Sequence, residues 1–267
     1  MFFIHEMTVI LGDSNVRQFQ EAISSPGFGV IFFSGATIKG LSNSQSHHHA
    51  GSLIQTICQN PHLKHILLMF GSVDYDFSLA KHLWDKYASQ DIELKEEYVD
   101  EFIQEVISKY NSFLTELIKF KTTPSIIHIL APQVSPMTDR TLIANLRNQN
   151  TINTPFPDSH EDSKQQNCFK GEFFSNASRA RRTLQANDVL EIVVRDLALA
   201  AQSANTIYKQ QQIYLHRIDR EMVTEATVTE ISSENATGAI QERFLTCDHH
   251  PKVTETLALW KQKLKIW

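Results

Sequence analysis

The sequence predicts a single α/β domain, residues 1–267, in which helices cover both faces of a central parallel sheet of about five strands. Three observations predict this class. Short apolar runs bounded by turn residues alternate with longer segments of helical period, which is typical of β-α-β units. The 267 residues are 42% hydrophobic and 21% charged, so the chain can bury one sizeable core. Several of its nine glycines stand where an apolar run ends.

The predicted strands are the five apolar runs at residues 8–11, 29–33, 65–70, 125–130 and 212–216. The predicted helices occupy residues 15–24, 51–59, 94–121, about 176–204 and 253–264. In residues 94–121 the apolar side chains recur at spacings of three and four, which indicates a long amphipathic helix. His128 lies inside the fourth apolar run and is interpreted as a hydrogen-bonded core histidine, whereas His62 and His65 are expected at the surface.

Residues 132–171 interrupt the alternation, because they are rich in Asn, Gln, Ser, Thr, Asp and Pro. A loop of that length in a compact domain is unusual, and it follows the fourth strand, where a parallel sheet has its active-site edge. We interpret the segment as a lid or substrate loop; a surface insertion is the equal alternative. Residues 221–242 are a second weakly patterned stretch, expected as a small hairpin or a loop.

Composition argues against several classes of partner. The net charge of -5 and pI near 6.2 disfavour a general attraction to nucleic acid or to an anionic membrane. The three cysteines form no C-x-x-C pair and are expected as free thiols. With no convincing signal peptide and no apolar run of membrane-spanning length, a cytoplasmic location is expected. His47, His48 and His49 are consecutive and cannot all ligate one ion, so no metal site is expected there. No other cofactor is expected either.

Ser14 is the first candidate for chemistry. The first apolar run stops on Gly12-Asp13-Ser14 and a helical segment follows. A serine there has its hydroxyl at the carboxyl edge of the sheet and its N–H near a helix N-terminus, which favours a developing oxyanion. The alternative is an ordinary turn and helix cap, since Asp and Ser are common there.

Other strand ends carry similar features. Gly35 and Gly40 flank a short loop after the second run, the third run ends in Gly71-Ser72-Val73-Asp74, and Asp248-His249-His250-Pro251 precedes the last helix. Because the carboxyl ends of parallel strands share one edge, these groups are expected to converge there. Nucleophilic catalysis requires such a convergence.

On these motifs the chain resembles the SGNH, or GDSL-type, esterase and acyltransferase superfamily. GDSN with Ser14 is similar to its first block, SGATIKGL with Gly35 to its second, FGSVD to its third and DHHP to its fifth. The resemblance implies a flavodoxin-like strand order and a catalytic triad of Ser14, Asp248 and His250 without a cofactor. It also implies an oxyanion site at Gly35.

Two departures from the family pattern stand out. Val73 occupies the place where the third block has an asparagine that donates to the oxyanion, so Ser72 or a residue of the predicted lid is a candidate substitute donor. The family's aspartate stands three residues before its histidine, whereas Asp248 stands one and two residues before His249 and His250. His250 is preferred as the base because it precedes proline, and His249 remains an alternative.

Two further residues are candidates for the oxyanion or substrate site. Asp74 is either part of the site or a structural cap of the strand-end turn, and the cap is favoured. Arg182, in a run with Arg179 and Arg181, could bind an anionic group of a substrate, or could lie on a solvated helix face.

The sequence therefore predicts a serine-dependent esterase or O-acyltransferase that acts on an ester of a carbohydrate or other small polar molecule. A non-catalytic glycan- or ligand-binding module of the same fold is the alternative, because of Val73 and the irregular Asp248 spacing. A nucleotide or phosphate binder using the Gly12 turn ranks third, since it leaves Asp248 and His250 without a role.

Overall fold

A computed structural model of the chain describes residues 7–24, 26–43, 45–46, 49–87, 92–121, 123–135, 176–203, 211–222 and 251–264. Its strands are β1 (Met7–Gly12), β2 (Phe28–Phe32), β3 (Leu63–Met69), β4 (Ser125–Leu130) and β5 (Gln211–His216). They form one all-parallel sheet in the order β2-β1-β3-β4-β5. The predicted fold class, number of strands and strand order are confirmed.

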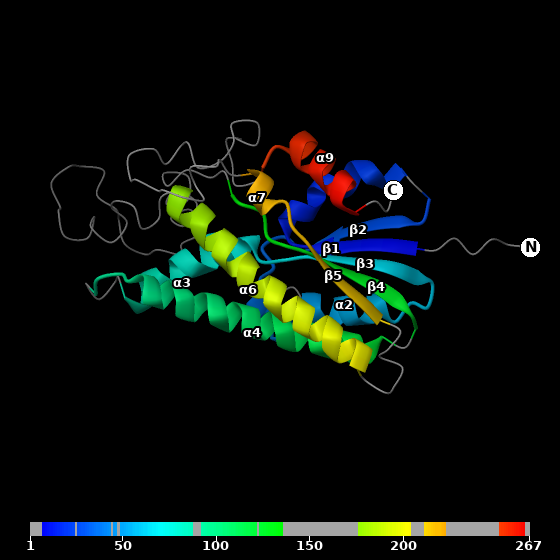
Figure 1. The fold of residues 1–267 in the computed structure, drawn as a ribbon, viewed down its shortest axis with the longest axis horizontal. Helices are drawn as coiled ribbons and strands as arrows, with labels where there is room; N and C mark the ends of the chain where they lie inside the picture. The colour runs from blue at the N-terminus through cyan, green and yellow to red at the C-terminus, as the bar shows by residue number, and fades with distance from the viewer. Residues whose placement is uncertain are drawn as a thin grey trace, which may run out of the picture.

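The helices alternate with the strands along the chain (Figure 1). They are η1 (Ser14–Ser24), α1 (Ile38–Leu41), α2 (Ala50–Cys58), η2 (Asp74–Ser78), α3 (Leu79–Lys86), α4 (Glu96–Phe120), α6 (Asn176–Ser203), α7 (Asp219–Met222) and α9 (Val253–Leu264). The η1 segment is a 3-10 helix and η2 is a single π turn that runs into α3. The bounds of β4 and α9 are those predicted from the sequence, whereas α1, η2, α3 and α7 were not predicted.

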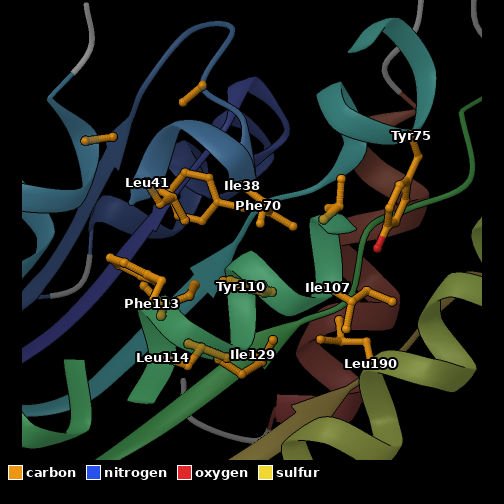
Figure 2. Packing of buried hydrophobic residues seen from close by; sticks show 14 of the residues in the cluster. Ile38, Leu41, Phe70, Tyr75, Ile107, Tyr110, Phe113, Leu114, Ile129 and Leu190 are labelled. Atoms are coloured by element: carbon orange, nitrogen blue, oxygen red, sulfur yellow. The ribbon is translucent and has the colours of Figure 1, made fainter. Parts of the chain in front are cut away.

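One face of the sheet packs against α1, α2, α3, α4 and α6. Odd-numbered residues of β1, even-numbered residues of β3 and odd-numbered residues of β4 point to this face, as the two-residue repeat of a strand requires. Figure 2 shows side chains from the strands, α1, α4 and α6 gathered in this cluster, with Ile129, Leu114 and Leu190 among them. Helix α4 contributes the largest share, because ten of its residues, at spacings of three and four, are buried against the sheet, whereas Phe120 at its end is exposed.

The opposite face is covered by η1 and α9, which lie together above β1 and β2 in Figure 1. Phe19 of η1 and Trp260 of α9 fill the middle of this second layer, with ring centroids 6.3 Å apart. Helices on both faces complete the three-layer arrangement. Within the part of the chain that the structure describes, no helix is long and apolar enough to cross a membrane.

His128 lies on the η1 side of β4 and is 5% exposed. Its Nε2 is 3.0 Å from Nδ1 of His65 on β3, and its Nδ1 is 2.9 Å from Nε2 of His216 on β5. The prediction of a hydrogen-bonded core histidine is confirmed. His65 was predicted at the surface and is instead half-buried within this row, because β3 begins at Leu63 and already includes it.

Candidate active site

The candidate site is formed where β2, β1 and β3 end side by side. Gly12 is in register with Phe32 of β2 and with Met69 of β3. Ser14, Gly35 and Ser72 follow the ends of these strands by two or three residues. The strand register therefore brings the three loops that carry the predicted residues to one edge of the sheet, as the sequence motifs predict.

Ser14 is the first residue of η1 and is 8% exposed. The preceding residue, Asp13, fixes its turn: Oδ1 of Asp13 accepts hydrogen bonds from the Asn15 backbone N at 3.0 Å and from Asn15 Nδ2 at 3.1 Å. The turn is closed by the Val16 N–H, which donates to the Asp13 carbonyl at 3.2 Å. Ser14 therefore occupies the central position of an Asx turn, between a strand end and a helix start.

Gly12 allows this turn to lie directly against β3. A Cβ atom at Gly12 would stand 2.2 Å from the carbonyl oxygen of Met69 and 2.5 Å from Cγ1 of Val16. The Asp13 N–H also donates to that Met69 carbonyl, at 3.0 Å. No other residue type could occupy position 12 without moving β1 away from β3.

Gly35 lies in the loop between β2 and α1 and has a φ of +73°, which favours glycine. Hydrogen bonds hold this loop on either side of Gly35. The Phe33 N–H donates to the Gly12 carbonyl at 2.8 Å, and the Ala36 N–H donates to the Phe33 carbonyl at 3.0 Å. The Gly35 loop is thus bonded to the end of the strand that carries Ser14.

Asp74 joins the Gly35 loop to the end of β3. Its Oδ2 accepts a hydrogen bond from the Ile38 backbone N at 2.7 Å, at the start of α1. Asp74 is fully buried, and burial raises its pKa to about 7, opposed by the backbone N–H groups of Ile38 and Lys39. These contacts hold the start of α1 against the end of β3.

Ser72 is 8% exposed, and its Oγ is buried without a hydrogen-bond partner among the described residues. A hydroxyl in that state can still donate, because its hydrogen rotates to suit an acceptor. Val73 follows at the place where the family has an amide donor, and it supplies only its backbone N–H. Ser72 therefore remains the candidate substitute donor in this loop.

Sequence reasoning missed three buried polar residues close to the site. Burial raises the pKa of Asp13 to about 6, opposed by Asn15 and by the backbone N–H groups of Ser72 and Val73. Burial raises the pKa of Asp76 to about 6 as well, opposed by the charge of Arg179 and a hydrogen bond from Ser135. Gln133 donates to Gln18 Oε1 at 3.2 Å and so connects the loop after β4 to η1.

These residues were missed because their burial cannot be read from the sequence. Asp13 stands inside the first motif, but an aspartate in a turn is usually solvated and gives no sign of being enclosed. Perturbed carboxyl groups cluster at functional sites, and this edge of the sheet has three of them in Asp13, Asp74 and Asp76.

The guanidinium of Arg182 pairs with a carboxylate of the protein itself and is not positioned to bind an anionic group of a substrate. The Arg182 side chain is 3% exposed, and its guanidinium forms a two-point ion pair with Glu96 at the start of α4: Nε lies 3.1 Å from Oε2 and Nη2 lies 2.7 Å from Oε1. The pair ties α6 to α4, and the carboxylate also suits the positive end of the α4 dipole. We therefore leave Arg182 out of the proposed substrate site.

The remaining predicted site residues lie outside the described residues: Asp248, His249 and His250. The predicted lid, residues 132–171, lies outside them as well except for its first four residues. His47 and His48 are also outside, whereas His49 precedes α2 in a left-handed conformation with a φ of 46°. Among the described residues, no group of three or more His, Cys, Asp or Glu side chains could hold a metal ion.

No family model matches the chain, and no curated protein matches it. Solved structures do match. One is the crystal structure of a putative acylhydrolase from Bacteroides fragilis, with a TM-score of 0.49 and 9% identity over 97% of this chain and 85% of the other. Another is phospholipase A1 from Streptomyces albidoflavus, with a TM-score of 0.43 and 12% identity over 97% of this chain and 99% of the other. Both likenesses concern the fold.

Proposed function

We propose that the chain is a serine-dependent esterase or O-acyltransferase in which Ser14 forms an acyl-enzyme. The observation that carries the proposal is the position of Ser14, held by Asp13 in a turn after β1 and flanked by the Gly35 loop and by Ser72. A nucleophile at the start of a helix, beside two backbone turns, is suited to attack on a carbonyl, because N–H groups there stabilise the oxyanion that forms.

In the proposed mechanism His250 takes the proton from Ser14 Oγ as the hydroxyl oxygen attacks the ester carbonyl. Asp248 orients the imidazole ring and stabilises its charged form. The backbone N–H groups of Ser14 and Gly35 donate to the oxyanion, with the Ser72 hydroxyl as a third donor. The oxyanion collapses with loss of the alcohol, which takes its proton from the imidazolium, and water or a sugar hydroxyl then releases the acyl group.

We propose an ester of a carbohydrate or another small polar molecule as the substrate. Support comes from the polar composition of residues 132–171, which follow the carboxyl end of β4 in the sequence. Hydrolysis of p-nitrophenyl acetate compared with p-nitrophenyl palmitate, and deacetylation of an acetylated sugar, separate this class from lipid esters. A higher kcat/KM for palmitate than for acetate would contradict it.

A fluorophosphonate probe tests the proposed nucleophile directly, because it reacts with activated serines. We expect mass spectrometry to find one label, on Ser14, and expect Ser14→Ala to abolish both the label and ester hydrolysis. His250→Ala and His249→Ala, measured side by side, identify the base as the variant that loses labelling. Folded wild-type protein that the probe does not label would contradict the proposal that the chain is an enzyme.

The alternative is a non-catalytic binding module of the same fold. Val73 favours it, because its side chain cannot donate a hydrogen bond where the family has an asparagine. Binding of an acetylated glycan in calorimetry by a protein that neither reacts with the probe nor hydrolyses the glycan is the result that this alternative predicts.

A further inference from the structure

Two buried carboxyl groups, from Asp13 and Asp74, bind the backbones of the two loops that carry the proposed oxyanion donors. Both side chains are fully buried. Asp13 directly follows β1, and Asp74 begins η2, five residues after the end of β3. Neither residue is needed as an acid or a base in the mechanism proposed for Ser14.

Asp13 connects the Ser14 turn to the loop after β3. Through Oδ1 it accepts from both nitrogen atoms of Asn15, which fixes the turn around Ser14. The Asp13 backbone N–H donates to the Met69 carbonyl, at the end of β3, at 3.0 Å. The backbone N–H groups of Ser72 and Val73 also oppose the rise in the pKa of its carboxyl group, while Oδ2 of Asp13 has no hydrogen-bond partner among the described residues. A movement of the loop after β3 would therefore displace the Ser14 backbone as well.

Asp74 connects the loop after β3 to the Gly35 loop. Its 2.7 Å bond from the Ile38 N–H lies three residues after Gly35, and the backbone of Lys39 also stabilises its charge. The side chain of Ile38 packs against the same turn, since a Cβ atom at Gly71 would stand 3.1 Å from Ile38 Cδ1. Figure 2 shows Ile38 beside Phe70, the residue before that glycine.

The two links run in series, from the Ser14 turn through the loop after β3 to the Gly35 loop. We propose that Asp13 and Asp74 are positioning residues that hold the Ser14 and Gly35 N–H groups at the spacing that one oxyanion requires. This inference rests on the proposed function.

The cost of burying both carboxyl groups supports the proposal. Asp74 Oδ1 has no hydrogen-bond partner among the described residues, and burial raises the pKa of both groups. The charge of Asp13 raises the pKa of Asp74 further. An arrangement that opposes ionisation of two neighbouring acids is costly to stability and is typical of functional sites. Catalytic geometry gives a reason to retain it, since a displacement of about 1 Å can cost about 10²-fold in rate.

The test compares three variants of Asp74 that differ in the acceptor they offer to the Ile38 backbone N–H. Asp74→Ala removes the acceptor, Asp74→Glu keeps the charge but displaces it by one methylene, and Asp74→Asn keeps an oxygen that can accept from the Ile38 N–H. We expect Ala and Glu to slow fluorophosphonate labelling of Ser14 by about 10²-fold. With p-nitrophenyl acetate we expect kcat to fall to the same extent while KM stays within about twofold. Asp74→Asn should recover most of the rate.

Asp219→Asn is the matched control, because Asp219 is also buried but pairs with Arg217 after β5. It should lower the free energy of unfolding without changing the labelling rate of the folded protein. Folded Asp74→Ala or Asp74→Glu protein that is labelled at the wild-type rate would overturn the inference and leave the proposed function standing. If Asp74→Ala does not fold, Asp74→Glu alone decides. Wild-type protein that is not labelled would overturn both.

Discussion

Nδ1 of His128 lies 2.9 Å from Nε2 of His216, within a row of three imidazoles that crosses β3, β4 and β5. The ring of His128 is also stacked on that of His65, with centroids 5.3 Å apart. Burial first, and then the neighbouring His216 and His65, lower the pKa of His128 to about 3. Three neutral imidazoles can form one hydrogen bond at each of the two contacts, because each neutral ring has one N–H donor and one acceptor nitrogen. Burial and the two neighbouring rings oppose a positive charge on His128.

The lowered pKa predicts a loss of stability in acid. In the unfolded chain His128 takes up its proton near the ordinary pKa of about 6.5, whereas in the folded protein it stays neutral down to about pH 3. Between these values the unfolded state binds more protons, so the free energy of unfolding falls as the pH falls, by at most about 1.4 kcal/mol per pH unit for this group. In His128→Leu, urea unfolding between pH 4 and 7 should show a shallower slope.

His62→Leu is the control for this measurement, because His62 is exposed in the loop before β3. Its slope against pH should match that of the wild type. Equal slopes for wild type and His128→Leu would contradict the assignment of His128 as a group that stays neutral in the folded protein.

The ion pair between Arg182 and Glu96 predicts a structural role for this arginine. Glu96→Gln leaves the buried guanidinium of Arg182 without the negative charge that offsets its burial. Because Glu96 itself is half exposed, we expect a moderate loss of about 1–2 kcal/mol in the free energy of unfolding. Glu97→Gln, the exposed neighbour in the same helical turn, should change it by less than about 0.5 kcal/mol. Denaturant unfolding of the two variants measures both, and equal stabilities would argue that the pair contributes nothing.

The strands could be predicted because a buried parallel sheet requires short, continuous apolar runs. Their order was implied by the resemblance to the SGNH superfamily and not by the alternation with helices. Helix α1 is four residues long and contains Gly40, so it has no period to detect. Ser14 and Gly35 could be located because a strand end and a helix start leave a sequence pattern. The burial of Asp13 could not be predicted, because it depends on residues near position 72, far away in the sequence. The ion pair of Arg182 could not be predicted either, because its partner Glu96 lies 86 positions away.

Two glycines in the same pair of strands predict opposite responses to alanine. At Gly12 a Cβ atom would collide with the Met69 carbonyl, and backbone cannot move aside as a side chain can. We expect Gly12→Ala to cost about 3 kcal/mol or to prevent folding. At Gly29 the nearest atom to an added Cβ is Val9 Cγ2, at an ordinary 3.9 Å, so Gly29→Ala should be neutral or stabilise by about 0.5–1 kcal/mol. Thermal unfolding of the two variants checks this, and a similar cost at both sites would contradict the close approach at Gly12.

Val73 offers a gain-of-function prediction. It stands between Ser72 and Asp74 after β3, the strand paired with β1, and its side chain cannot donate a hydrogen bond. Because removal of one oxyanion donor typically costs about 10²–10³ in rate, installing one should raise it. We expect Val73→Asn to increase kcat for p-nitrophenyl acetate by at least about 10-fold with little change in KM, since the added donor acts on the charge that develops in the transition state. Val73→Leu has the shape of asparagine without its donor and should give no increase. If both variants have the wild-type kcat, the side chain at position 73 does not reach the oxyanion, and the site works with the backbone donors and Ser72.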